Sequence, residues 1–237
     1  MTIHILATGT SRGIGRAIAD ALSGADVRVV GQATSAADAH TLAADLDQPG
    51  AASVLWNEAL ERLDGRIDVL VNNAGIFEAS PLDSPDDEWL AAWERTMRVN
   101  LTASAELCRH AVRHFQQRGG GGRIVNVASR AAYRGDSPAH WHYAAAKAGM
   151  VAMTKTIARG YAAQEILAFA VCPGFTMTGM AEEYLASRGG DKLLADIPLG
   201  RVAQPEEVAA AVRFLALEAP ASMTGAVIDI NGASYVR

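Results

Sequence analysis

The sequence predicts an α/β fold, a doubly wound parallel sheet in one domain spanning residues 1–237. Two observations lead to this prediction. Apolar strand-like runs alternate with helical segments throughout, and no linker or internal repeat divides the chain. Alternation of this kind places helices on both faces of a parallel sheet. Because ligands of such sheets bind at the carboxyl ends of the strands, functional residues are expected in the turns that follow them.

The elements are read in order from apolar runs, helical periodicity and turn residues. The first strand covers residues 3–7, and a glycine-rich turn and a short helix follow it. After the second strand, 26–31, residues 35–39 are too few for a full helix. The remaining predictions are an apolar piece at 41–44, a helix at 51–63, a strand at 67–71, one long helix at 86–114, a strand at 123–128, a helix at 142–162, a strand at 166–172, a mixed segment at 180–199, a helix from 205 to about 217 and a last strand at 226–230.

The first strand runs into a turn containing Gly9, Gly13 and Gly15. Glycines between a strand and a helix let the backbone approach a phosphate, and the helix N-terminus offers N–H groups and a partial positive charge. The spacing Gly-x-x-x-Gly-x-Gly favours a pyrophosphate site. The alternative is a tight turn whose glycines serve packing alone.

Tyr143 and Lys147 are four residues apart in a helical run, so they share one helix face. A free tyrosine has a pKa near ~10, and a neighbouring lysine cation is expected to lower it and make the phenol usable as a general acid or base. Ser129 follows a strand end, where its hydroxyl can bind a carbonyl or alcohol. Alone, the Tyr143–Lys147 spacing also fits an ordinary helix-surface pair.

The composition argues against several classes of function. A net charge of -5 gives no electrostatic reason to expect nucleic acid or an anionic membrane. No apolar stretch reaches the roughly 20 residues of a membrane span, and no basic segment precedes the first strand, so we expect a cytoplasmic protein. Cys108 and Cys172 are expected to be reduced and buried. His110 and His114 lack an evident third metal ligand, so no metal is expected, and no G-x-S-x-G elbow surrounds Ser129.

Taken together, the motifs resemble those of the short-chain dehydrogenase/reductase family, in its 3-oxoacyl-carrier-protein-reductase-like branch. The resemblance covers essentially the whole chain, and the ordered set is far more specific than any one motif. It rests on Thr8-Gly9-x-x-x-Gly13-x-Gly15, Asn72-Asn73-Ala74-Gly75, Asn100, Ser129, Tyr143-x-x-x-Lys147 and Pro173-Gly174-x-x-x-Thr178.

This resemblance implies a Rossmann fold and an NAD(P)-dependent oxidoreductase that interconverts a carbonyl and a secondary alcohol by hydride transfer. Tyr143 would be the general acid/base, Lys147 would lower its pKa and bind the nicotinamide ribose, Ser129 would polarise the carbonyl, and Asn100 would hold a relay water through a backbone distortion. The implied dinucleotide contacts are Gly9, Ser11, Arg12, Gly13, Ile14, Gly15, Thr34, Asp45, Leu46, Asn73, Ala74, Gly75, Tyr143, Lys147, Pro173, Gly174, Thr176 and Thr178.

The end of the second strand indicates which dinucleotide binds. An acid there would bind a ribose 2′-hydroxyl and repel a 2′-phosphate, and residues 31–35 contain none. Arg12 could meet a 2′-phosphate, and Thr34 or Ser35 could add a hydroxyl. NADP(H) is therefore favoured over NAD(H), although residues 35–43 are fewer than is usual in the family. The alternatives are an NAD(H)-dependent alcohol or polyol dehydrogenase and a non-catalytic dinucleotide-binding regulatory protein.

The substrate, a small-molecule carbonyl or alcohol, is not encoded in any motif. The three residues just before the tyrosine, His140, Trp141 and His142, fit equally well a place in the substrate pocket or a role in packing at the helix start or in a subunit contact. Met177, Met180 and Tyr184 could form an apolar lid or could serve packing. The two long helices, 86–114 and 142–162, resemble those that assemble family tetramers, so a homotetramer is expected, with a dimer as the alternative.

Overall fold

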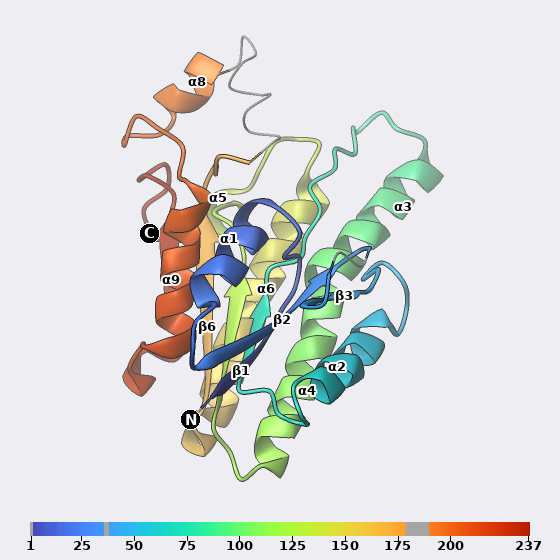
Figure 1. Ribbon diagram of the computed structural model, residues 1–237. Helices are drawn as coiled ribbons and strands as arrows, with labels where there is room; N and C mark the ends of the chain where they lie inside the picture. Colours follow the sequence, from blue (N-terminus) through green and yellow to red (C-terminus); the bar gives the residue numbers. More distant parts are fainter. Residues whose placement is uncertain (1, 36–37, 179–189) are drawn as a thin grey trace.

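The computed structural model describes residues 2–35, 38–178 and 190–237, and these residues contain one sheet of seven parallel strands in the order β3-β2-β1-β4-β5-β6-β7. The α/β doubly wound fold is thereby confirmed (Figure 1). Strand β1 pairs with β2 on one side and with β4 on the other, and the reversal of strand order at β1 creates a crevice at the carboxyl ends of these strands. The strands are β1 (Ile3–Ala7), β2 (Val27–Ala33), β3 (Thr41–Ala43), β4 (Val69–Asn72), β5 (Gly122–Val127), β6 (Ile166–Pro173) and β7 (Val227–Ile230).

Helices pack on both faces of the sheet because successive strand residues point to opposite sides. In β1, Ile5 and Ala7 pack toward α1 (Gly13–Leu22) and α9 (Pro205–Leu217), whereas Leu6 packs toward the opposite layer. That opposite layer consists of α2 (Ala51–Arg62), α4 (Ala103–Gln117) and α6 (Trp141–Tyr161), with α3 (Asp86–Met97) leading into α4 (Figure 1). Two short helices, α5 (Ala131–Arg134) and α8 (Gly190–Ala195), lie near the carboxyl ends of the strands.

The long helix predicted over residues 86–114 is interrupted in the middle. Between α3 and α4, Arg98–Thr102 form a π-helical turn, η1, with Asn100 at its centre. Asparagine is a poor helix former, and π-helical turns concentrate at functional sites. The backbone distortion expected at Asn100 is therefore present.

Other differences from the prediction are small. Strand β2 extends through Gln32 and Ala33, two residues further than predicted. Among the described residues between β2 and β3, which are 34–35 and 38–40, none is helical. Met180 and Tyr184 lie outside the described residues. Both cysteines are free and buried, as expected.

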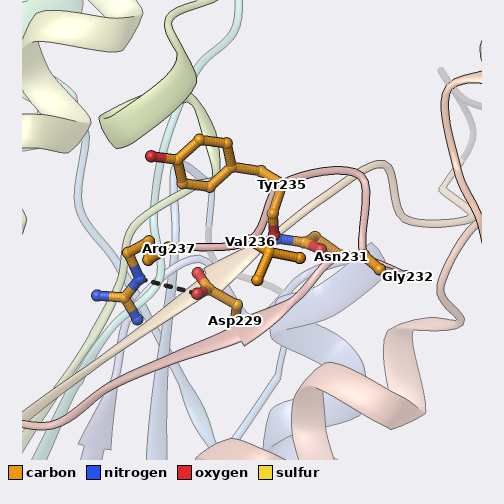
Figure 2. A pocket seen from close by; sticks show the side chains of 7 residues that line it. Asp229, Asn231, Gly232, Tyr235, Val236 and Arg237 are labelled. Atoms are coloured by element: carbon orange, nitrogen blue, oxygen red, sulfur yellow. Dashed lines mark hydrogen bonds and ion pairs between the residues drawn. The ribbon is translucent and has the colours of Figure 1, made fainter.

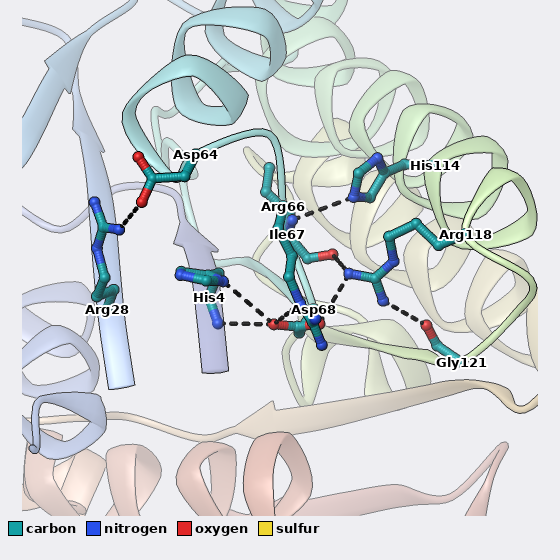
Figure 3. Close-up of polar contacts among 9 residues, drawn as sticks. All are labelled: His4, Arg28, Asp64, Arg66, Ile67, Asp68, His114, Arg118 and Gly121. Atoms are coloured by element: carbon teal, nitrogen blue, oxygen red, sulfur yellow. Dashed lines mark hydrogen bonds and ion pairs between the residues drawn. The ribbon is translucent and has the colours of Figure 1, made fainter. Parts of the chain in front are cut away.

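A polar network lies at the opposite, amino-terminal edge of the sheet (Figure 3). Asp68 precedes β4 and accepts hydrogen bonds from the His4 backbone N–H at 2.9 Å and from Arg118 Nη1 at 2.8 Å. Burial alone would raise the pKa of Asp68, but the bonds from His4, Arg118 and Arg66 outweigh it and hold that pKa below its usual value. The carboxylate thus joins the start of β1 to the end of α4.

We expect Asp68→Asn to lower the free energy of unfolding at neutral pH by about 1–3 kcal/mol, because charge-assisted bonds are lost at a largely buried site. A depressed folded-state pKa contributes stability above the unfolded value of about 3.9 and loses it as pH falls through the folded pKa. The difference between the two proteins in urea denaturation should therefore shrink below about pH 4.

Asp64→Asn provides the matched control, because Asp64 forms an exposed ion pair with Arg28 in the same region. An exposed pair contributes about 0–1 kcal/mol. Equal losses in the two variants would contradict the role assigned to Asp68.

Candidate functional site: a dinucleotide-sized cavity

A cavity of about 740 Å³ lies at the carboxyl ends of the strands. It is lined by every residue that the sequence assigned to the dinucleotide, and also by Ser129. Asn100 does not line the cavity but lies next to Gly75, which does. A smaller hollow of about 380 Å³ lies beside the C-terminal residues, where Arg237 pairs with Asp229 (Figure 2), and it contains none of the predicted site residues. The larger cavity is therefore the candidate site.

The glycine turn fits closely against the end of β4. Gly9 and Gly13 have φ values of +69° and +54°, a region that side-chain-bearing residues rarely occupy. A Cβ on Gly15 would lie 1.8 Å from the Gly9 carbonyl oxygen, and one on Gly13 would lie 3.1 Å from Thr178 Cγ2. The turn therefore requires glycines for its own packing. This requirement is compatible with the predicted pyrophosphate site at the same residues.

Asn73 and Thr8 hold the turn in place. The Asn73 side-chain amide donates to the carbonyls of Thr8 at 3.0 Å and Gly9 at 3.1 Å. In return, the Thr8 hydroxyl accepts from the backbone N–H groups of Asn73 and Ala74, both at 3.0 Å. These four bonds join two segments that are more than sixty residues apart in sequence.

Helix α1 begins at the cavity without a side-chain cap. Its N-cap residue, Arg12, makes no capping hydrogen bond, and its first turn contains no acid. The first N–H groups of a helix need an acceptor, and a phosphate placed there satisfies them and interacts favourably with the helix dipole. The residues present therefore fit a dinucleotide pyrophosphate.

Gln32 is a site residue that the sequence analysis missed. Its side-chain oxygen accepts from the Gly9 N–H at 2.9 Å, and its side-chain nitrogen donates to the Ala44 carbonyl at 2.7 Å. The buried amide thus connects the glycine turn to the residue that follows β3. No motif marks it, because its role depends on two backbone groups that only the fold brings near.

Ser129, Tyr143 and Lys147 meet at the other end of the cavity. Ser129 follows β5, and its side chain hydrogen-bonds Tyr143. The Lys147 ammonium donates to the Val127 carbonyl at 2.9 Å and lies 5.8 Å from the centroid of the Tyr143 ring. Lys147 is 4% exposed, so its charge is almost fully removed from water.

The pKa values differ from the sequence-based expectation. Burial raises the pKa of Tyr143 to about 12, against the lowering effect of its bond with Ser129. Burial also lowers the pKa of Lys147 to about 8. The expectation that Lys147 lowers the Tyr143 pKa is therefore wrong for this structure: the pKa is raised because loss of water around the hydroxyl disfavours the phenolate, and the hydrogen bond with Ser129 is the contact that lowers it. In this state Tyr143 is a protonated phenol, which can donate a proton to a substrate oxygen.

Asn100 contacts the site from behind. Its side-chain oxygen accepts from the Ile76 N–H at 2.8 Å, and its side-chain nitrogen donates to the Ile76 carbonyl at 2.9 Å. A Cβ on Gly75 would lie 3.2 Å from the Asn100 oxygen and 3.5 Å from Lys147 Nζ. Gly75 therefore lies between the two predicted relay residues. Any water held by Asn100 would be bound through its backbone, as expected from the distorted turn.

A buried chain of polar side chains fixes α6 to the sheet. Asn72 on β4 donates to Asn126 on β5 at 2.8 Å, and Asn126 donates to the Thr154 hydroxyl on α6 at 2.8 Å. Thr154 donates in turn to the Met150 carbonyl. Because α6 also carries Tyr143 and Lys147, this chain helps to set their position over β5.

The three residues 140–142 do not line the cavity themselves. Instead Phe77, which the sequence analysis missed, lines it and stacks on the His140 ring with centroids 3.9 Å apart. Phe77 also meets Tyr143 edge-on at 4.8 Å. His142 is buried and stacks on Trp93, whereas Trp141 is exposed. Packing therefore accounts for His142, and His140 supports the wall of the cavity through Phe77.

The histidines 110 and 114 each have a partner within the protein. His110 Nε2 lies 2.9 Å from the Ser53 hydroxyl, and His114 Nε2 accepts from the Ile67 N–H at 3.2 Å. Within the described part of the chain, no group of three His, Cys, Asp or Glu residues could hold a metal ion.

Within the same part, no helix has both the length and the apolar character needed to cross a membrane.

Comparison with known proteins finds relatives along nearly the whole chain. A family model described as enoyl-(acyl carrier protein) reductase matches residues 9–233. The 3-oxoacyl-[acyl-carrier-protein] reductase of Haemophilus influenzae is 37% identical, with 98% of this chain and 97% of the relative covered. The enzyme of the same name from Escherichia coli K12 is 34% identical, with 98% and 96% covered.

Among solved structures, the ligand-free aldohexose dehydrogenase of Thermoplasma acidophilum superposes with a TM-score of 0.86 at 27% identity. The match covers 100% of this chain and 95% of that one. On the evidence of the family model, the sequence relatives and the fold, the chain belongs to the short-chain dehydrogenase/reductase family of NAD(P)-dependent oxidoreductases that act on CH–OH groups or carbonyls.

Proposed function

We propose that the protein is an NADP(H)-dependent reductase that converts a carbonyl to a secondary alcohol, with Tyr143 as the general acid. The observation that carries this proposal is the meeting of Ser129, a protonated Tyr143 and Lys147 at one end of a cavity whose other end is formed by the glycine turn. The names of the bacterial relatives, which describe reduction of 3-oxoacyl groups, support the reductive direction.

A nicotinamide dinucleotide held by the glycine turn at one end of the cavity and by Lys147 and residues 173–178 at the other would supply the hydride for the carbonyl carbon. The Ser129 hydroxyl donates a hydrogen bond to the carbonyl oxygen and so polarises it. Tyr143 gives its proton to the same oxygen as negative charge develops there. Lys147 stabilises the resulting phenolate electrostatically, since its ammonium is held close to the Tyr143 ring. Within this proposal, the proton that Tyr143 gives up is replaced through Lys147 and a water held by the Asn100 backbone.

The preference for NADP(H) is supported by the chemistry around the end of β2. Arg12 and Thr34 are exposed and both line the cavity. Gln32, near the end of β2, is a neutral amide bonded to Gly9 and Ala44, so residues 31–35 present no carboxylate that would repel a 2′-phosphate. Asp38, the first described acid after β2, is not among the cavity-lining residues, and its carboxylate accepts from the His40 N–H.

We expect Arg12→Ala to weaken NADPH binding by at least about tenfold, because an arginine–phosphate hydrogen bond contributes about 1.5–3 kcal/mol. NADH binding should change little, since NADH lacks the 2′-phosphate. Titration of both proteins with each dinucleotide, followed by nicotinamide fluorescence, measures this difference.

Arg16→Ala is the matched control. Arg16 lies four residues further along, pairs with Asp20 on the exposed face of α1 and does not line the cavity. Tighter binding of NADH than of NADPH by the unmodified protein, or equal weakening of both by Arg12→Ala, would overturn the assignment of NADP(H).

We also propose that the chain assembles as a homotetramer through the long helices α4 and α6, as in the family that it resembles. Sedimentation of the purified protein tests this proposal, and a monomer at all concentrations would refute it.

A further inference from the structure

Arg130 places a buried positive charge in the wall of the cavity, directly after Ser129 in sequence. The residue is 9% exposed and lines the cavity together with Phe175. Its backbone N–H donates to the Pro173 carbonyl at 2.9 Å, which fixes it between the ends of β5 and β6. Its guanidinium lies over the Phe175 ring, 5.0 Å from the centroid. Contact with the face of an aromatic ring does not use the N–H donors at the edges of a guanidinium.

The charge of Arg130 is incompletely compensated within the described part of the chain. Its Nη1 atom lies 3.5 Å from an Asp196 oxygen, which is long for a hydrogen bond, and makes no hydrogen bond with any described residue. The same Asp196 oxygen accepts from Arg134 at 2.7 Å, and the Asp196 side chain is 48% exposed. Two guanidinium groups therefore share one solvent-exposed carboxylate.

A buried cation without a full partner is unfavourable, and an anion placed beside it offsets the cost of desolvation. Burial lowers the pKa of the Arg130 guanidinium, in keeping with this deficit. Asp136, which also lines the cavity, carries a negative charge that partly compensates Arg130. It is exposed, however, so water and salt screen it more strongly than they screen Arg130.

We propose that Arg130 binds a carboxylate of the substrate, so that the preferred substrates are oxo acids whose carbonyl lies against Ser129 and Tyr143. This inference rests on the proposed carbonyl reductase function and specifies its substrate class. In this proposal, the Arg130 guanidinium takes no part in hydride or proton transfer. It holds the acid end of the substrate, and its effect is therefore on binding.

The test compares oxo acids with their methyl esters, which keep the carbonyl and lose the charge. Acetoacetate and 4-oxopentanoate, each with its methyl ester, are titrated against the NADPH-saturated protein and assayed for NADPH oxidation. We expect the unmodified protein to bind at least one acid about tenfold or more tightly than its ester. Arg130→Gln should remove that preference by weakening the acid alone, and Arg130→Lys should restore part of it.

Two further variants separate a binding role from a structural one. Arg134→Gln is the matched control, because Arg134 shares Asp196 but does not line the cavity, and the acid preference should change less than about threefold. Asp196→Asn removes the competing carboxylate and should preserve or increase the acid preference. If Arg130 served only to anchor Asp196, Asp196→Asn and Arg130→Gln would have the same effect on both ligands.

The outcomes also distinguish this inference from the proposed function. Reduction of the esters with no preference for the acids, or equal weakening of acid and ester by Arg130→Gln, would overturn the carboxylate site while leaving the reductase intact. Tight, Arg130-dependent binding of an acid without NADPH oxidation by any acid or ester would support the site and overturn the reductase.

Discussion

Tyr143→Phe is expected to lower the turnover number for carbonyl reduction by about 10²–10⁴-fold, the usual contribution of a positioned general acid. The substitution removes a single oxygen, so the cavity keeps its shape and the glycine turn is untouched. NADPH should therefore bind within about threefold of the normal affinity, because the lost group contributes to proton transfer and little to dinucleotide binding.

Steady-state kinetics and NADPH titration of the same preparation measure the two effects separately. Tyr161→Phe is the control, since Tyr161 lies at the far end of α6 and outside the cavity lining. Near-normal turnover in Tyr143→Phe would refute its assignment as the acid. Loss of turnover together with loss of NADPH binding would indicate a structural role instead.

Gly15→Ala should abolish dinucleotide binding, or weaken it more than about a hundredfold. The added methyl group would lie 1.8 Å from the Gly9 carbonyl oxygen and 2.5 Å from the Asn73 side-chain nitrogen. Both atoms belong to the hydrogen-bonded junction of the glycine turn and the end of β4. Since a backbone oxygen cannot move away by a change of rotamer, the turn itself must shift, and the backbone groups that face the pyrophosphate move with it.

Gly160→Ala is a matched control within another helix. Gly160 lies near the end of α6, and no atom would lie within 4 Å of an added Cβ there. Alanine exceeds glycine in helix propensity by about 1 kcal/mol, so this variant should be equally or more stable and should bind NADPH normally. Normal NADPH binding by Gly15→Ala would show that the turn tolerates displacement and is not the pyrophosphate site.

The sequence was most informative where one residue type has one physical role. The alternation of apolar runs with helical segments predicted the fold, since each apolar run had to be buried between layers of helices. Asn100 is an example within the site. Asparagine is a poor helix former, the family resemblance implied a backbone distortion at this position, and a π-helical turn is centred there.

The sequence was least informative where a role depends on distant backbone groups or on burial. Gln32 acts through Gly9 and Ala44, and Phe77 joins the site by stacking on His140, 63 residues away. Neither contact leaves a local pattern. The four-residue spacing of Tyr143 and Lys147 predicted their proximity, but the direction of the Tyr143 pKa shift depends on how much water surrounds its hydroxyl, which no spacing encodes.

The central claim is that Tyr143 donates its proton and that a buried Lys147 cation stabilises the phenolate that forms, and the pH dependence of kcat/KM at limiting NADPH tests it most directly. That parameter reports the ionisation of the free enzyme, in which the pKa of Lys147 is about 8 and that of Tyr143 about 12. We predict constant activity through neutral pH and a fall above about pH 8 as Lys147 loses its proton. In Lys147→Arg the fall should disappear, whatever the absolute rate, because arginine stays protonated. A wild-type profile that remains level to about pH 10, or a fall that persists unchanged in Lys147→Arg, would contradict the account.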